Sequence, residues 1–250
     1  MSESIVYNMD CMEYMRTLPD KAFDLAIVDP PYGDGNGGSA KRFGGMFGAV
    51  YGENTRARIA DAHERERERD APQYNRFGGR FDKYKSEPDE TGGKKIVAWD
   101  VAPKEEYFQE LFRISRDQII WGGNYFSLPP TRCFLILRKT NIPENFSMAM
   151  CEYAWTSFNG NAKVFDFNMQ GQPGRFHPTQ KPVELYEWIL TRFAKEGDKI
   201  LDTHLGSGSS RIAAYNLGFD FVGCEIDREY YEKQEERFAA HTAQMSLFTK

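Results

Sequence analysis

The 250-residue sequence is poor in residues that hold metals or disulfides, with four cysteines and four histidines. Its cysteines form no C-x-x-C pair and lie far apart in the chain, at Cys11, Cys133, Cys151 and Cys224. This spacing is typical of reduced thiols and excludes a zinc finger or a disulfide framework. The scattered histidines form no ligand cluster either, so we expect no metal.

Long apolar runs are absent as well. No stretch approaches the roughly 18 residues that a membrane span needs. The first ten residues, MSESIVYNMD, lack the basic and apolar regions of a signal peptide. With 40% hydrophobic and 28% charged residues, the composition is that of an ordinary soluble protein. We therefore expect no membrane contact.

The formal net charge of −5 argues against a protein that simply coats nucleic acid. The charge is unevenly distributed, however. Residues 41–95 hold 13 Lys and Arg against 10 Asp and Glu, a net +3, so the rest of the chain carries −8. Any contact with phosphate groups is therefore expected from this middle segment.

Most of the chain alternates between strand-like and helix-like stretches. The expected strands are 4–7, 23–28, 96–100, 118–123, 134–139, 151–158, 199–202 and 219–227, and the expected helices are 11–17, 104–114, 182–194, 209–218 and 228–240. This alternation predicts one α/β domain over 1–250 with a Rossmann-like, doubly wound, mostly parallel sheet and helices on both faces. Trp155 and the run 121–126 either line a ligand pocket or, the favoured reading, are buried core aromatics.

Residues 33–95 interrupt the alternation and hold twelve of the 22 glycines. Two near copies, KRFGGMF at 41–47 and NRFGGRF at 75–81, flank the charged stretch HERERERD at 63–70. Like charges fall at i,i+4 in that stretch, so it predicts only a marginal polar helix. We expect residues 33–95 to be a long flexible insertion in the domain.

The sharpest local signal is VDPPY at 28–32, which ends the apolar run 23–28. Proline cannot donate a hydrogen bond to a sheet, so the chain must leave the sheet here. The turn that follows presents a carboxylate, carbonyl oxygens and an aromatic ring. Such an acceptor-rich pocket with a stacking platform suits a planar hydrogen-bond donor.

A second signal is the run KILDTHLGSGSS at 199–210. A strand leads into Gly206-Ser207-Gly208 and then a helix, and Glu225 ends the next strand 19 residues after Gly206. Glycines let a ligand approach the backbone, and an acid at this spacing accepts ribose hydroxyls. The full motif G-x-G-x-x-G is absent, so a nucleoside cofactor fits better than NAD.

These two signals, with HPTQKP at 177–182 between them, resemble the DNA amino-methyltransferases of the permuted β group. The resemblance covers about residues 5–33 and 96–240, with the motifs in the family's order. It implies transfer of a methyl group from S-adenosyl-L-methionine, which leaves S-adenosyl-L-homocysteine, to the exocyclic amine of a base flipped out of DNA. Asp at the first position of the turn is typical of the adenine-N6 enzymes.

In that family the first residues of the turn accept hydrogens from the target amine, and its aromatic ring stacks on the flipped base. The resemblance therefore implies a catalytic turn made of Asp29, Pro30, Pro31 and Tyr32. No Pro-Cys motif occurs, so methylation at cytosine C5 is not expected. A cytosine-N4 enzyme, an RNA adenine methyltransferase and a catalytically silent DNA-binding regulator stay open as alternatives.

The resemblance also assigns a cofactor site. Glu225 matches the ribose-binding acid, and Thr179 with Lys181 matches positions that hold the methionyl carboxylate. The expected cofactor-binding residues are Asp10, Cys11, Asp29, Thr179, Lys181, Asp202, His204, Gly206, Ser207, Gly208, Ser209 and Glu225. The chain departs from the family where Thr203-His204 replace the usual Pro-Phe, so His204 either packs like the Phe or adds a polar contact.

Two further expectations concern partners. The basic, aromatic insertion serves as a DNA-recognition loop or merely as a lid, and its expected DNA contacts are Lys41, Arg42, Phe43, Arg76, Phe77 and Arg80. An exposed C-terminal tail, 241–250, contains Gln244–Phe248, which resembles the peptide that binds the bacterial sliding clamp. The reduced thiols and this tail favour the cytoplasm of a bacterium or of a phage-infected bacterium. A homodimer and a role in restriction-modification stay open.

Overall fold

The computed structural model describes residues 2–32, 101–144, 149–170 and 174–248. The chain divides into two units. The first, here called the sheet unit, comprises Met1–Pro30, Pro103–Ile142 and Ala149–Lys250, and the second comprises Pro31–Ala102 and Pro143–Met148. The expected insertion, 33–95, falls within the second unit. That insertion and the strand expected at 96–100 lie outside the described residues.

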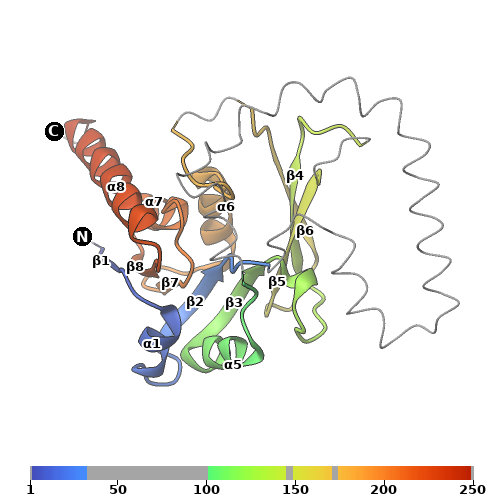
Figure 1. Cartoon of the computed structure of the whole chain (residues 1–250). Helices are drawn as coiled ribbons and strands as arrows, with labels where there is room; N and C mark the ends of the chain where they lie inside the picture. Colours follow the sequence, from blue (N-terminus) through green and yellow to red (C-terminus); the bar gives the residue numbers. More distant parts are fainter. Residues whose placement is uncertain (1, 33–100, 145–148, 171–173, 249–250) are drawn as a thin grey trace, which may run out of the picture. The chain divides into compact units, whose positions relative to one another are not determined.

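An eight-stranded sheet forms the centre of the sheet unit (Figure 1), in the order β1-β8-β7-β2-β3-β5-β4-β6. The strands are β1 (Ser4–Tyr7), β2 (Phe23–Val28), β3 (Ser115–Trp121), β4 (Phe134–Lys139), β5 (Cys151–Thr156), β6 (Lys163–Phe167), β7 (Lys199–Asp202) and β8 (Asp220–Cys224). All neighbours are parallel except β5, which is antiparallel to both β3 and β4. The expected mostly parallel sheet is confirmed.

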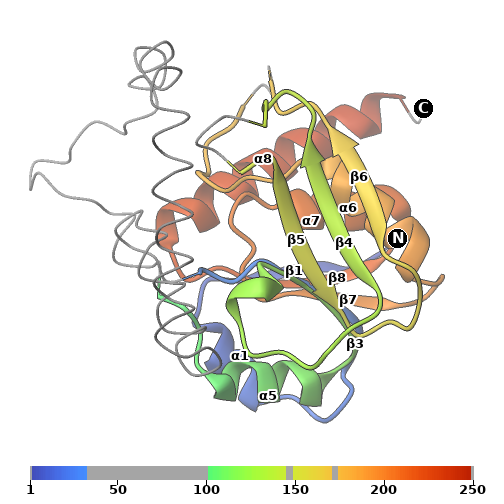
Figure 2. The same ribbon diagram turned by 90° about the vertical axis from the view of Figure 1, so that its right-hand side faces the viewer.

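Helices cover both faces of this sheet (Figure 2). One face carries α1 (Cys11–Arg16) and α5 (Glu105–Ile114), and the other carries α6 (Val183–Phe193), α7 (Ser209–Leu217) and α8 (Arg228–Phe248). A short 3-10 helix, η2 (Gly123–Tyr125), follows β3. Within the described ranges, no helix is both long and apolar enough to cross a membrane.

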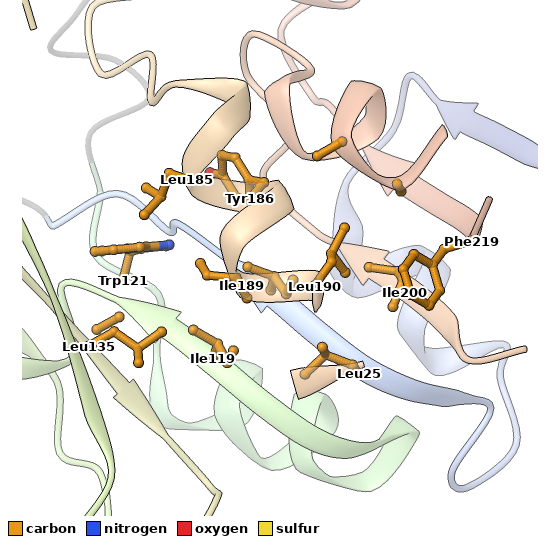
Figure 3. Close-up of a cluster of buried hydrophobic side chains, with 14 of the residues drawn as sticks. Leu25, Ile119, Trp121, Leu135, Leu185, Tyr186, Ile189, Leu190, Ile200 and Phe219 are labelled. Carbon is orange, nitrogen blue, oxygen red and sulfur yellow. The ribbon is translucent and has the colours of Figure 1, made fainter. Parts of the chain in front are cut away.

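The main core lies between the sheet and the helices α6 and α7 (Figure 3). Alternate residues of a strand point to opposite faces, so Leu25 and Ile27 of β2 join this core with Ile189 of α6. Trp121 is fully buried in it, and Phe126 and Trp155 are also buried, as expected of core aromatics. Tyr125 of the same run departs from that expectation, because its side chain is 38% exposed. Burial of each large apolar side chain contributes about 1.5–3 kcal/mol, so this layer fixes the strands that carry the site.

Two elements differ from the expectation. β6 was not foreseen, because it is an edge strand whose alternation is weak, with Val164 left 55% exposed. The last helix was expected to end near Ala240, with an exposed tail over 241–250, but α8 continues to Phe248. The stretch after Ala240 contains neither glycine nor proline, so nothing in it stops the helix.

Candidate active site

β2 and β7 are neighbours in the sheet, but the chain leaves them toward opposite sides. β2 is followed by β3 on one side, and β7 is followed by β8 on the other. Ligands of doubly wound sheets bind at such a switch point, outside the carboxyl ends of the strands. The parallel register Ala26↔Leu201 brings Asp29, just after β2, to the same edge as the loop that follows Asp202.

The loop after β7 needs glycine at two positions. Gly206 and Gly208 have φ angles of 52° and 74°, in the left-handed region that glycine adopts without strain. A Cβ atom at Gly206 would also lie 3.2 Å from ring atoms of His177. Ser207 and Ser209 are buried, with their hydroxyl oxygens 3.1 Å apart. The loop predicted from GSGS is therefore a fixed, tightly packed turn.

Helix α8 supports this loop from a distance in sequence. Arg237 donates hydrogen bonds to the Ser207 carbonyl oxygen (2.8 Å) and to the Ser209 hydroxyl oxygen (3.0 Å). The side chain of Gln234 lies 3.2 Å from where a Cβ atom of Gly208 would be. Sequence reasoning missed both residues, because a polar residue in a charged amphipathic helix gives no sign of what it contacts.

Two buried carboxylates flank the loop, those of Asp202 and Glu225. Each accepts two hydrogen bonds from neighbouring groups: His204 N (3.0 Å) and Ser210 Oγ (2.6 Å) for Asp202, and Gly206 N (2.8 Å) and Asp227 N (2.9 Å) for Glu225. Burial raises the pKa of Glu225 and raises the pKa of Asp202 to about 7. Carboxylate oxygens have further acceptor capacity, so this pair suits a ligand with hydroxyl groups or positive charge.

Beyond Glu225 the edge is partly apolar. Ile226 is 63% exposed, which is unusual for a large hydrophobic side chain beside a buried acid. The pairing of β1 with β8 brings Asp10 to this edge, where its side chain caps α1 by accepting from Met12 N (2.7 Å). Burial, and then the charge of Asp10, raises the pKa of Cys11 to about 12, so its thiol stays protonated.

Thr203 and His204 make both kinds of contact considered from the sequence. The His204 ring packs edge-on against Tyr107 of α5, with 5.3 Å between centroids, and its Nδ1 lies 3.0 Å from Thr203 Oγ1. The Tyr107 hydroxyl lies 2.6 Å from the same Thr203 oxygen. Burial lowers the pKa of His204 to about 4, so the ring is neutral at physiological pH.

The HPTQKP segment packs between the loop and α8. His177 contacts Tyr230 of α8 edge-on, with 4.4 Å between ring centroids, and its Nδ1 lies 3.2 Å from the Thr179 hydroxyl oxygen. Burial lowers the pKa of His177 to about 4. Thr179 is exposed, so its hydroxyl is reachable by a ligand. Its expected contact with the methionyl carboxylate stays a prediction.

Asp29 is paired with Lys181, a residue for which the sequence predicted a contact with the cofactor. Lys181, expected at the methionyl carboxylate, donates a hydrogen bond to Asp29 and lies 3.2 Å from Glu152 Oε2. Glu152 in turn pairs with Lys139, with 2.6 Å between Nζ and Oε1. Sequence reasoning missed Glu152 and Lys139. The sequence did offer a signal for them, because Lys139 is the last residue of the apolar strand β4 and Glu152 lies near the start of β5.

Several expected site residues stay untested. Pro31 and Tyr32 belong to the second unit, so their roles remain predictions. The expected DNA contacts lie outside the described residues: Lys41, Arg42, Phe43, Arg76, Phe77 and Arg80. In the part of the chain that the structure describes, no three His, Cys, Asp or Glu side chains are grouped so as to hold a metal ion.

The glycine loop after β7, the buried Glu225 after β8 and Asp29 after β2 lie at one edge of the sheet, an arrangement typical of Rossmann-like proteins that bind a nucleoside cofactor. Comparison with known proteins narrows this class. Residues 120–236 match the N6_N4_Mtase family, described as DNA methylase. Type II methyltransferase M2.DpnII of Streptococcus pneumoniae is 26% identical, over 96% of this chain and 91% of its own. Type II methyltransferase M2.LlaDCHI of Lactococcus lactis subsp. cremoris is 26% identical over 94% and 88%.

Solved structures share the fold. The PvuII DNA methyltransferase (cytosine-N4-specific) has a TM-score of 0.54 at 12% identity, covering 95% of this chain and 87% of its own. A putative DNA modification methylase from Thermus thermophilus, complexed with S-adenosyl-L-methionine, has a TM-score of 0.50 at 17% identity, covering 96% and 94%. The family match, which covers just under half of the chain, and the two bacterial relatives show that this chain is similar to DNA methyltransferases, in line with the resemblance.

Proposed function

We propose that this enzyme methylates the N6 amine of an adenine flipped out of DNA. The observation that carries the proposal is the position of the Asp29 carboxylate. Asp29 leaves β2 at the switch point, one strand away from the glycine loop that follows β7. A base amine bound at Asp29 and a cofactor bound at the loop would therefore meet at one edge of the sheet.

The residues of the turn suit an amine that is a poor nucleophile. The lone pair of the adenine amine is delocalised into the ring, and the amine is far too weakly acidic for a carboxylate to deprotonate first. Asp29, as a carboxylate, is an acceptor, and Pro30 has only a carbonyl oxygen to offer. Hydrogen bonds from the amine to these two acceptors localise its lone pair toward the methyl group. Positioning and electrostatics thus supply the catalysis, and the proton leaves after methyl transfer.

The residues around the glycine loop suit S-adenosyl-L-methionine, which supplies a methyl group on a positively charged sulfur. Glu225 would accept the ribose hydroxyls, and Ile226 would cover an apolar face of the adenine. The acidic edge formed by Asp202 and Glu225 favours a cation. Lys181 has three N–H donors, of which the contacts to Asp29 and Glu152 use two. One donor is left for the methionyl carboxylate.

The test is mass spectrometry of nucleosides from unmethylated DNA incubated with the enzyme and S-adenosyl-L-methionine. N6-methyldeoxyadenosine from the wild type, and none from Asp29→Ala, is the expected result. N4-methyldeoxycytidine would keep the acceptor chemistry and refute the adenine assignment. A methylated base in RNA alone would refute the DNA substrate. Cofactor binding without any methylated base would indicate a silent regulator.

We further propose that the insertion contacts DNA and that Tyr32 stacks on the flipped base. Stacking on an aromatic ring is worth about 1–3 kcal/mol per base, which offsets part of the cost of extruding it. The net charge of +3 over 41–95 supports contacts with phosphate groups. Deletion of residues 41–85 should weaken DNA binding and relax site preference. Unchanged affinity and preference in filter-binding and methylation assays would refute the contact.

A separate proposal concerns partners and location. Gln244–Phe248 would bind a bacterial sliding clamp, and the enzyme would act in the cytoplasm of a bacterium or of a phage-infected bacterium, as a monomer or a homodimer. Clamp binding requires these residues to leave the helical conformation of α8. Calorimetry of a bacterial sliding clamp with a peptide of residues 240–250 tests this binding, and the absence of binding heat would refute it. Sedimentation equilibrium decides between monomer and dimer.

A further inference from the structure

Four charged side chains of alternating sign form a chain behind the proposed amine site. Asp29 accepts a hydrogen bond from Lys181, Lys181 pairs with Glu152 at 3.2 Å, and Glu152 pairs with Lys139 at 2.6 Å. We call these four residues the charge chain. With every member ionised, its formal charge is zero. Such neutrality is what permits several charges to be buried together.

The members of the charge chain come from four separate segments. Asp29 follows β2, Lys181 precedes α6, Glu152 lies on β5 and Lys139 ends β4. In the antiparallel pair of β4 and β5, Leu137 lies opposite Glu152, so Lys139, two residues on, is its diagonal neighbour on the same face. The sheet itself therefore sets the contact between Glu152 and Lys139, and places both residues at the edge of the sheet where β2 ends.

Burial makes these contacts strong. The exposed side-chain fractions of Lys181, Lys139 and Asp29 are 3%, 11% and 13%, and the Lys181 ammonium lies 5.1 Å from the centroid of the Trp121 ring. Burial opposes the charge of Lys181, but Asp29 and Glu152 outweigh it and raise the pKa of Lys181. Burial likewise opposes the charge of Glu152, but Lys181 and Lys139 lower its pKa to about 2. Both groups stay ionised at neutral pH.

We propose that Glu152, anchored by Lys139, is a positioning residue for methyl transfer that acts through Lys181 on Asp29. An ammonium that pairs with a single carboxylate takes up much of that carboxylate's capacity to accept. Glu152 shares the Lys181 charge, so Asp29 keeps the negative charge with which it accepts a hydrogen bond from the target amine. This inference rests on the proposed function, and it deepens the role of the same site.

Removal of the Glu152 charge has a defined electrostatic consequence. Lys181 would then pair with Asp29 alone, which makes Asp29 a weaker acceptor. Other groups face this cluster as well and stay unchanged: Tyr186 of α6, His177 of the HPTQKP segment and Asp202 after β7. The rate of methyl transfer should therefore fall.

The experiment compares Glu152→Gln with Asp166→Asn. Both variants replace a carboxylate that pairs with a cation by an amide, but Asp166 pairs with Arg138 on the exposed face of β6. The single-turnover methylation rate is measured at saturating S-adenosyl-L-methionine, and the affinity for S-adenosyl-L-methionine is measured by calorimetry. For Glu152→Gln we expect a rate about 10- to 100-fold lower and an unchanged cofactor affinity. Asp166→Asn should match the wild type in both, and the conservative variant Glu152→Asp should recover part of the rate.

A wild-type rate for Glu152→Gln overturns the proposal. So does a slower rate with an equally weakened cofactor affinity and a lower melting temperature, because that combination indicates a merely structural role. If the single variant fails to fold, Glu152→Gln with Lys139→Met leaves no unpaired buried lysine and should show the same loss of rate. The carbon-13 chemical shift of the Asp29 carboxyl, measured without DNA at neutral pH, separates the two claims: a changed chemical shift in Glu152→Gln supports the charge chain even if adenine is not the target.

Discussion

Around the glycine loop, Asp202 and Glu225 are held by backbone N–H groups and a hydroxyl from the contiguous segment 199–227. One strand away, Asp29 is held by Lys181, which lies 152 residues further along the chain and depends in turn on β4 and β5. The cofactor half of the site is thus made of local backbone geometry. The amine half is made of charges brought together by the sheet.

This difference separates binding from reactivity. Changes in the backbone or acids of the cofactor half should alter affinity for S-adenosyl-L-methionine, because that half forms the surface on which the cofactor would lie. Changes in the charges of the amine half should alter the rate of methyl transfer at saturating cofactor, because they act on the group that accepts hydrogens from the target amine. The comparison would be wrong if substitutions in the cofactor half altered only the rate, or if substitutions in the amine half altered only cofactor affinity.

The largest effect in the cofactor half is expected from Gly206→Val. A β-branched residue at φ 52° is strained, and its Cβ atom would lie 3.2 Å from the His177 ring. Calorimetry should show an affinity for S-adenosyl-L-methionine lower by about 100-fold or more, since strain and displacement of the loop together cost about 3 kcal/mol.

The matched control is Gly197→Val. Gly197 has a φ of 87°, but no atom lies within 4 Å of its would-be Cβ and it lies in the turn before β7. This variant should be less stable yet bind the cofactor as the wild type does. Equal cofactor affinity in the two glycine variants would show that the loop backbone does not form the binding surface.

A smaller effect on cofactor affinity, with a pH signature, is expected from Asp202→Asn. The folded pKa of Asp202, about 7, exceeds the unfolded value of about 3.9, so the stability of the wild type falls as pH rises from about 4 to about 7. The amide removes this loss. Chemical denaturation should show Asp202→Asn more stable than the wild type at pH 8 by about 4 kcal/mol, but not at pH 4.

The same variant should bind the cofactor about 10-fold more weakly, because a negative charge near the sulfonium is lost. A stability difference between variant and wild type that is the same at both pH values would contradict the raised pKa of Asp202. An unchanged cofactor affinity would place Asp202 outside the cofactor half.

The smallest effect is expected from His204→Phe. The folded pKa of His204, about 4, lies below the unfolded value of about 6.5, so the wild type loses stability as pH falls through this window. Phenylalanine keeps the contact with Tyr107 and removes the titration. Between pH 7 and pH 4 the variant should lose about 3 kcal/mol less stability than the wild type in denaturant titrations. An identical loss would exclude His204 from the acid response.

The parts of the molecule that the sequence predicted are those whose chemistry is local. The glycine loop and Glu225 lie within one strand-helix-strand unit, so their spacing alone indicated a ribose-binding edge. The alternation of strands and helices likewise predicted the sheet. β6 was missed because an exposed edge strand shows little apolar alternation.

The charge chain was beyond sequence reasoning for a different reason. The contact between Lys139 and Glu152 depends on the register of two antiparallel strands, which their hydrophobic pattern does not reveal. Lys181 looked like a ligand for the cofactor, because a cation at the start of a helix next to a cofactor motif suits a carboxylate. The structure pairs it with Asp29, which is also a carboxylate, and its contact with the cofactor stays a prediction.

The most direct test of the account measures, for Asp29→Ala, the single-turnover rate of N6-methyladenine formation and the affinity for S-adenosyl-L-methionine. The account predicts a rate at least about 1,000-fold below that of the wild type at saturating cofactor, with an affinity within about threefold, because Asp29 stabilises the reacting amine and not the cofactor. A rate within about tenfold of the wild type, or a loss confined to cofactor affinity, would contradict it.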